Sequence, residues 1–173
     1  RRSAEERARD LVASGRPFAV VLADLDRFKK LNDTRGHDAG DKALRLFAET
    51  LRQSMRDGDM ASRWGGEEFV LILSHANAQQ ANEAVERIRV ALATALLTGG
   101  TAVFTASFGI ADTTMSPQFE RMLRIADEAL YRAKEEGRDR AVIGNSQLVT
   151  TGEFRRPFEH PSSVSIRKLA LEG

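Results

Sequence analysis

Hydrophobic residues in this chain follow two patterns, continuous short runs and helical spacing. The apolar run at residues 18–23 predicts a buried central strand, which Asp24, Leu25 and Asp26 close with alternating acids. Further strands are predicted at residues 60–64, 69–73, 102–110 and 141–143. The first two of these form the arms of a hairpin.

Helical segments alternate with these strands. Residues 3–14 have helix-forming composition, and residues 27–40 predict a short helix and a loop. Gly137 is predicted at the C′ position of the last helix. Amphipathic helices are predicted at residues 41 to about 55, 78 to about 97, and 119–136. The alternation predicts an α/β or α+β sandwich, in which helices flank an antiparallel or mixed sheet of about five strands.

The composition narrows the range of functions. The 173 residues include 26 Lys and Arg against 25 Asp and Glu, so no global field favours nucleic acid or an acidic membrane as a partner. The lack of cysteine excludes disulfides, thiolate metal ligands and a cysteine nucleophile. No apolar run reaches membrane-spanning length and no signal-peptide pattern opens the chain, so we expect a cytoplasmic segment without membrane contact.

The two ends of the chain differ from its middle. The charged start at residues 1–6 suggests a piece of a longer regulator, of which this segment is the output domain. From Asn145 onward the pattern gives way to Ser, Thr, Pro and scattered charge. We therefore expect one globular domain over residues 1–144 and a flexible tail over 145–173, where 164–171 could form a helical turn or two.

The most informative stretch is Gly65-Gly66-Glu67-Glu68-Phe69. Two glycines supply the positive φ angles of a two-residue hairpin, and two carboxylates follow them before an apolar strand. At about 4 Å and an effective dielectric near 20, two like charges cost roughly 4 kcal/mol. A divalent cation with a phosphate ligand removes that cost. The alternative is an ordinary hairpin with solvated glutamates.

Asp24 and Asp26 lie two residues apart at the end of the first strand, so both can project to the same face. With Glu67 and Glu68 they make four acids that could converge at one edge of the sheet. Such carboxylates are the arrangement expected for two-metal phosphoryl transfer, although Mg²⁺ itself needs few of them. Alone, an Asp-x-Asp at a strand end is equally typical of a turn or an N-cap.

Two pairs of cations accompany the acids. Lys29 and Lys30 follow the first strand, and Lys134 and Arg138 lie one turn apart at a helix end. A clamp on a triphosphate is the functional interpretation. Solvated lysines and cations favourable to a helix C-terminus are the alternative.

Five segments carry a more specific signal. They are DLDRFKKLND at residues 24–33, GHDAGD at 36–41, RWGGEEF at 63–69, SFGI at 107–110 and ADEALYRAKEEGR at 126–138. In order and spacing they resemble the GGDEF family of diguanylate cyclases, over about residues 1–144. The resemblance implies a palm-like fold related to nucleotide cyclases and the condensation of two GTP into cyclic di-GMP, with release of pyrophosphate.

The resemblance implies a role for each matching residue. Asp24, the backbone carbonyl of Leu25 and Glu67 would hold Mg²⁺ or Mn²⁺, with Glu68 nearby. Glu67 would also be the base for the 3′-hydroxyl, and Lys29 would stabilise the charge on the phosphoryl group. Substrate contacts would come from Phe28, Asn32, His37, Asp41, Gly65, Gly66, Lys134 and Arg138. Because no single chain can complete the product, the resemblance also implies a homodimer.

Asp41 would select the nucleotide base, guanine over adenine. Its carboxylate can accept hydrogen bonds from guanine N1–H and N2–H₂, a pattern that adenine does not offer, which favours GTP over ATP. Without the resemblance, Asp41 is typical of the N-cap of the following helix, and His37 is an ordinary loop histidine.

Arg56-Asp57-Gly58-Asp59 forms an RxxD motif shortly before the hairpin. In the family this motif is an inhibitory site that binds cyclic di-GMP, and Arg87 matches a further arginine of that site. An arginine fork suits guanine edges and phosphates. By itself RxxD is more typical of a polar turn.

Two departures from the family pattern are visible. The chain begins at what resembles the last two arginines of the opening family segment, so we expect an N-terminally truncated domain. Glu67 stands where many members have Asp, and both residues occur in active members. The alternative functions are a catalytically silent module that senses GTP or cyclic di-GMP, a structural dimerisation domain, and a cyclase that uses ATP.

Overall fold

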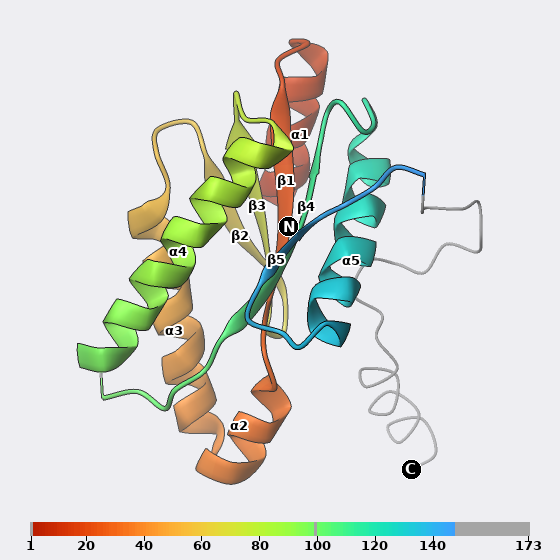
Figure 1. The fold of residues 1–173 in the computed structure, drawn as a ribbon. Helices are drawn as coiled ribbons and strands as arrows, with labels where there is room; N and C mark the ends of the chain where they lie inside the picture. Colours follow the sequence, from red (N-terminus) through yellow and green to blue (C-terminus); the bar gives the residue numbers. More distant parts are fainter. Residues whose placement is uncertain (1, 99, 148–173) are drawn as a thin grey trace, which may run out of the picture.

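The computed structural model describes residues 2–98 and 100–147 of the chain. Its core is a five-stranded sheet in the order β2-β3-β1-β4-β5 (Figure 1). The strands are β1 (Phe18–Leu25), β2 (Met60–Gly65), β3 (Glu68–Ser74), β4 (Ala106–Asp112) and β5 (Ala141–Ile143). The central strand β1 is antiparallel to β3 and β4, whereas β5 runs parallel to β4. The predicted mixed sheet flanked by helices is therefore confirmed.

The helices form a layer on each face of the sheet. They are α1 (Arg2–Ala13), α2 (Phe28–Arg35), α3 (His37–Ser54), α4 (Ala78–Thr98) and α5 (Phe119–Glu135). Helices α3 and α4 cover one face, and α1 and α5 cover the other (Figure 1). The two-residue period of β1 sends Val21 and Ala23 to the first layer and Val20 and Leu22 to the second. Asp24 continues the second series and so faces α5.

Two glycines fix the position and the end of α5. A Cβ on Gly109 of β4 would overlap the backbone of Ala126 and Leu130, so only glycine lets the helix lie this close to the strand. At the helix end, Gly137 has φ +119° and the N–H of Arg138 donates to the carbonyl of Ala133 at 2.9 Å. This is the predicted C′ glycine, in a Schellman motif.

Three predicted boundaries differ from the structure. β1 extends to Leu25, beyond the predicted 18–23, because its acids continue the ladder with β3 and β4. The strand predicted at 102–110 occupies Ala106–Asp112 instead. It begins at Ala106 because this residue pairs with Leu25, the last residue of β1. Helix α3 begins at His37, after Gly36 at φ +84°, so Asp41 lies inside the helix and is not its N-cap.

No helix within residues 2–98 and 100–147 is long and apolar enough to cross a membrane. Most of the predicted tail at 145–173 falls outside the described residues, and so does the helical turn expected at 164–171. The site described below is built from the end of β1, the β2–β3 hairpin, the start of α2 and the end of α5.

Candidate active site

The hairpin between β2 and β3 places the two glutamates differently from the prediction. Gly65 pairs with Glu68 after a bulge, so the two turn residues are Gly66 and Glu67, not Gly65 and Gly66. Only Gly66 of this pair of glycines has a positive φ, of +41°. Arg63 closes the turn through a 2.8 Å bond from its Nε to the carbonyl of Gly66. Glu67 is therefore held at the tip, and Glu68 opens β3.

The end of β1 lies beside these glutamates. Asp24 is the cross-strand partner of Glu68, and the N–H of Leu25 donates to the carbonyl of Glu67 at 3.3 Å. The predicted metal ligands Asp24, Leu25, Glu67 and Glu68 are thus brought together by the ladder between β1 and β3. Antiparallel pairing explains this, because it sets one strand end against the start of the next.

Lys134, in the last turn of α5, reaches into the same place. Its Nζ lies 2.9 Å from Oδ2 of Asp24, and the two side chains are only 15% and 10% exposed. Asp127 lies seven residues earlier on the same helix face. We call Asp24, Glu67, Glu68 and Lys134 the strand-end cluster. Lys134, which the resemblance predicts as a substrate contact, is therefore an ion-pair partner of a predicted metal ligand.

The cluster carries more negative charge than Lys134 neutralises. Burial raises the pKa of Asp24 to about 6, against the opposing effect of Lys134 and with smaller contributions from Glu67 and Asp26. Burial also raises the pKa of Glu68 to about 8, and Asp24, Glu67 and Asp127 add to the rise. Buried carboxylates that repel each other favour a bound cation.

The donor set suits a hard divalent cation. Within the described residues, no three acidic, His or Cys side chains already surround one metal position. Asp24 and Glu67 offer carboxylate oxygens and Leu25 offers a carbonyl oxygen, all from the strand ends just described. Mg²⁺ takes few protein ligands and completes its shell with waters and phosphate oxygens. The residues therefore fit Mg²⁺ or Mn²⁺ bound together with a phosphate ligand.

Asp26 does not belong to the cluster. Its Oδ1 accepts from Ser107 Oγ at 2.6 Å. Its Oδ2 accepts from Thr105 Oγ1 at 2.6 Å and from the N–H of Asp139 at 3.1 Å. Both oxygens are occupied by the protein, so the predicted convergence of four acids is wrong for this residue. Asp24 and Asp26 therefore differ in their contacts: Asp24 pairs with Lys134, whereas Asp26 binds Thr105, Ser107 and Asp139.

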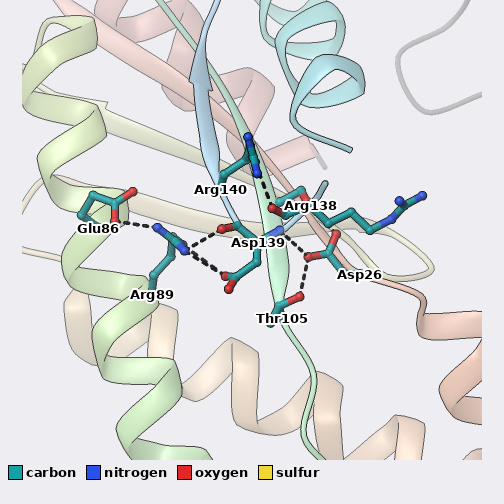
Figure 2. A network of polar contacts seen from close by, with 8 residues as sticks. Asp26, Glu86, Arg89, Thr105, Arg138, Asp139 and Arg140 are labelled. Carbon is teal, nitrogen blue, oxygen red and sulfur yellow. Dashed lines mark hydrogen bonds and ion pairs between the residues drawn. The ribbon is translucent and has the colours of Figure 1, made fainter. Parts of the chain in front are cut away.

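The bond to Asp139 leads to a second feature, the turn after α5 (Figure 2). Gly137, Arg138 and Asp139 have φ angles of +119°, +69° and +47°. For each non-glycine residue this conformation costs about 1–2 kcal/mol. Arg89 of α4 holds the turn by donating from Nη2 to the carbonyl of Asp139 at 2.6 Å and to its Oδ1 at 3.0 Å.

A cleft of about 510 Å³ opens between α2 and this turn, and Arg27, Lys30 and Arg138 are among its lining residues. The predicted pair Lys134 and Arg138 is joined by a 3.2 Å bond from Arg138 Nη1 to the Lys134 carbonyl. Sequence reasoning missed Arg89 and Asp139. No sequence pattern marks the positive φ angles of Arg138 and Asp139, or the contact between Asp139 and the distant Arg89.

The residues predicted to contact the nucleotide from this side lie on α2 and α3. Asn32 Oδ1 is buried without a hydrogen-bond partner within the described residues. A Cβ on Gly40 would overlap it and would also press on Phe28, so Gly40 makes room for both side chains. His37 and Asp41 are exposed one turn apart on α3, and Lys29 is exposed in the first turn of α2. An unpartnered buried acceptor is rare and is expected where a ligand binds.

The RxxD residues form a closed turn between α3 and β2. Arg56 Nε lies 3.3 Å from Asp59 Oδ2, and Arg56 Nη2 donates to the carbonyl of Ser74 at 3.2 Å. Asp59 Oδ1 in turn accepts from the N–H of Ser74 at 3.0 Å. Arg87, exposed on α4, makes no hydrogen bond or ion pair with any residue in 2–98 or 100–147. The structure therefore joins Arg56 and Asp59 but leaves Arg87 apart.

Comparisons with known proteins identify the family of the chain. The family model described as "Diguanylate cyclase, GGDEF domain" matches residues 1–140. Diguanylate cyclase DgcM of Escherichia coli is 40% identical over 131 residues, which are 76% of this chain and 32% of that protein. The chain spans about a third of the length of the curated relatives it matches.

Solved structures are similar as well. Diguanylate cyclase SiaD of Pseudomonas aeruginosa, crystallised with its activator SiaC, has a TM-score of 0.76 and 35% identity over 83% of this chain and 58% of that chain. The GGDEF domain of DgcB from Caulobacter crescentus, in complex with c-di-GMP, has a TM-score of 0.70 and 29% identity over 80% of this chain and 84% of that one. Both neighbours therefore resemble this chain in sequence as well as in fold.

Proposed function

The chain belongs to the GGDEF domain family of diguanylate cyclases, and from this premise we propose that it condenses two GTP into cyclic di-GMP and two pyrophosphates. The observation that carries the proposal is the strand-end cluster. Two of its carboxylates, Asp24 and Glu68, have raised pKa values, and Lys134 forms an ion pair with Asp24. A cation and a triphosphate supply the missing partners for these groups.

Guanine binds at α2 and α3 in this proposal. The unpartnered Oδ1 of Asn32 supports it, because guanine brings N–H donors to a buried acceptor that otherwise has none. Phe28 and Asn32 both border Gly40, and Asp41 adds a carboxylate acceptor from the next helix. His37 contacts the nucleotide from the first turn of α3. ATP is disfavoured because its base would leave these acceptors unpaired.

The triphosphate lies between the start of α2 and the end of α5. Helix α2 begins after Arg27 at φ +55° without a side-chain cap, so its first N–H groups are available to an anion. Lys29 lies in this first turn, and Lys134 and Arg138 approach from the other side. On phosphate binding, Lys134 is shared between Asp24 and the phosphate oxygens.

Asp24, the Leu25 carbonyl and Glu67 would hold Mg²⁺ or Mn²⁺, with Glu68 close by. When bound, the metal neutralises phosphate charge and polarises the phosphoryl group. Gly65 and Gly66 let the hairpin backbone approach the nucleotide at its tip. Lys29 stabilises charge that develops on the phosphoryl oxygens.

Turnover requires two copies of the chain, each with one GTP. Each 3′-oxygen forms a bond to the α-phosphorus of the other GTP, the bond from that phosphorus to the β-phosphate oxygen breaks, and pyrophosphate leaves. Glu67 accepts the hydroxyl proton. The chain contributes mainly positioning and charge neutralisation. We assign this activity to residues 1–144, acting in the cytoplasm where GTP is available.

A second binding site regulates the enzyme in this proposal. Arg56 and Asp59 bind cyclic di-GMP as an inhibitor, with Arg87 completing the site from α4. Support comes from the exposure of Arg56, whose side chain is 62% accessible at the turn. The related DgcB domain was crystallised with c-di-GMP.

Product analysis by mass spectrometry tests the proposal. The chain is stripped of nucleotide and incubated at high concentration with GTP and Mg²⁺, and with ATP in parallel. Cyclic di-GMP from GTP alone is the expected result. If a fused dimerisation module brings two copies together and GTP still yields no product, the enzymatic proposal fails and the chain is a binding module.

A further inference from the structure

The turn after α5 is held by Arg89, a side chain that no sequence motif marks. We propose that Arg89 is a positioning residue, which fixes the turn at Gly137, Arg138 and Asp139 so that Arg138 faces the triphosphate. The inference rests on the proposed function, since it assigns Arg89 a part in substrate binding. Arg89 itself does not touch the nucleotide.

Arg89 grips the backbone of the turn as well as a side chain. Its Nη2 donates to the carbonyl of Asp139 at 2.6 Å and to Oδ1 at 3.0 Å, and its Nε lies 3.4 Å from the same Oδ1. On its other side, Nη1 is anchored to Glu86 at 2.7 Å. A planar fork can hold a carbonyl and a carboxylate at once, whereas a lysine ammonium is a single point charge.

The opposite side of Asp139 is fixed to the end of β1. Its N–H donates to Asp26, whose carboxylate is itself held by Thr105 and Ser107. Asp139 is therefore bound through its N–H, its carbonyl and its carboxylate (Figure 2). This explains how a non-glycine residue stays at φ +47°.

Arg138 is the residue that this arrangement directs. Its backbone N–H and carbonyl are tied to Ala133 and to Arg140. Its guanidinium makes one hydrogen bond within the described residues, from Nη1 to the carbonyl of Lys134. The side chain extends away from Arg89 and past Asp26 (Figure 2), and Arg138 lines the 510 Å³ cleft beside α2. The free donors of Arg138 are thus offered to an anion in that cleft.

Loss of Arg89 releases the carbonyl and carboxylate of Asp139 together. Arg138 and Asp139 then relax toward ordinary negative φ angles, and the Arg138 side chain swings with its backbone. The expected effect is confined to the β- and γ-phosphates. GMP lacks these groups, so its binding is unaffected.

The experiment measures binding of GMP and of a GTP analogue with a methylene bridge between the α- and β-phosphates, which prevents turnover. Arg89→Ala is expected to bind the analogue about 10-fold more weakly and GMP as well as the unchanged chain does. Arg52→Ala is the matched control, because Arg52 forms the same (i, i+3) pair with Glu49 on α3. The control is expected to leave both affinities unchanged.

A double variant separates positioning from general destabilisation. If Arg89 acts through Arg138, Arg89→Ala combined with Arg138→Ala binds the analogue no more weakly than Arg138→Ala alone. Equal losses for GMP and the analogue, or additive losses in the double variant, would overturn the inference. If Arg89→Ala fails to fold, Asp139→Asn serves instead, since Asn tolerates a left-handed backbone and keeps an acceptor without the charge.

Asp139→Asn is expected to weaken analogue binding about 3-fold, and an unchanged affinity would overturn the inference. The proposed function fails separately. It fails when the unchanged chain binds neither guanine nucleotide, whatever the variants do. If the unchanged chain prefers the analogue to GMP and Arg89→Ala keeps the full preference, only the role of Arg89 is wrong.

Discussion

The strand-end cluster and the RxxD turn both contain arginine or lysine beside carboxylates, yet their charges are arranged in opposite ways. In the cluster Lys134 pairs with Asp24 beside two further carboxylates, and the pKa values of Asp24 and Glu68 are raised to about 6 and about 8. In the turn, Arg56 is matched by Asp59, and both are also bonded to Ser74. One region lacks positive charge, whereas the other is already satisfied by its own residues.

The difference bears on how each region meets a ligand. Bringing a cation and a triphosphate to the cluster relieves repulsion that already exists in the folded chain. A ligand at the RxxD turn must instead replace contacts that Arg56 already makes, so only the surplus appears as affinity. We infer that the first region is suited to continuous turnover and the second to a response that needs accumulated product.

The sharpest test of this contrast is Glu67→Gln. The change keeps the size of the side chain and removes a carboxylate that is both a proposed metal ligand and the proposed base, so the rate of cyclic di-GMP formation should fall about 10²–10⁴-fold. Initial rates with GTP and Mg²⁺ measure the effect, and thermal unfolding checks that the fold persists. Glu120→Gln, at an exposed position of α5, is the control. A Glu67→Gln chain with the original rate would remove both proposed roles.

Arg56→Ala tests the satisfied region. Charge-assisted hydrogen bonds from one arginine are worth about 1.5–3 kcal/mol, so the inhibition constant for cyclic di-GMP should rise roughly 10–100-fold. The initial rate without added product should stay the same, because the turn lies away from the cluster. Dose–response curves with cyclic di-GMP provide the measurement, and Arg52→Ala one turn earlier is the control. Unaltered inhibition would mean that the site is misassigned.

The sequence predicted the cluster better than the turns around it. A strand end and a hairpin with fixed spacing suffice to bring Asp24 and Glu67 together. The role of Asp26 was not predictable, because Thr105, Ser107 and Asp139 reach it from distant segments. The alternative interpretation of Asp41 as an N-cap is wrong, since α3 begins after Gly36, earlier than local propensity indicates. Local patterns specify elements, whereas long-range hydrogen bonds decide which acid stays free.

Glu68→Gln tests whether the cluster is strained when empty. A carboxyl whose pKa is raised from 4.5 to about 8 binds its proton more tightly in the folded than in the unfolded chain. Stability therefore falls as pH rises from 4.5 to 8, and the glutamine variant escapes this loss. After allowance for solvent screening the gain at pH 8 is about 1–2 kcal/mol, or roughly 3–6 °C in melting temperature.

Thermal unfolding with EDTA and without nucleotide measures the effect between pH 4.5 and 8. The two chains should differ least at pH 4.5, where Glu68 is protonated in the folded chain and about half protonated in the unfolded one, and should diverge as pH rises. Glu83→Gln on the exposed face of α4 is expected to show no such divergence. A Glu68→Gln chain that is less stable at pH 8 would show that the cluster is not strained.

Arg7→Ala produces the smallest expected effect and asks whether the satisfied turn depends on α1. Arg7 donates to the carbonyl of Gly58 at 2.8 Å and to Ser74 Oγ at 3.2 Å, so it holds the backbone on which Arg56 and Asp59 sit. Its loss should cost about 1 kcal/mol, or roughly 2–4 °C in melting temperature. Because the turn is then less preorganised, inhibition by cyclic di-GMP should weaken about 2–3-fold while the KM for GTP stays constant. Exposed Arg9 of the same helix is the control, and a KM that shifts as much as the inhibition would contradict a link confined to the turn.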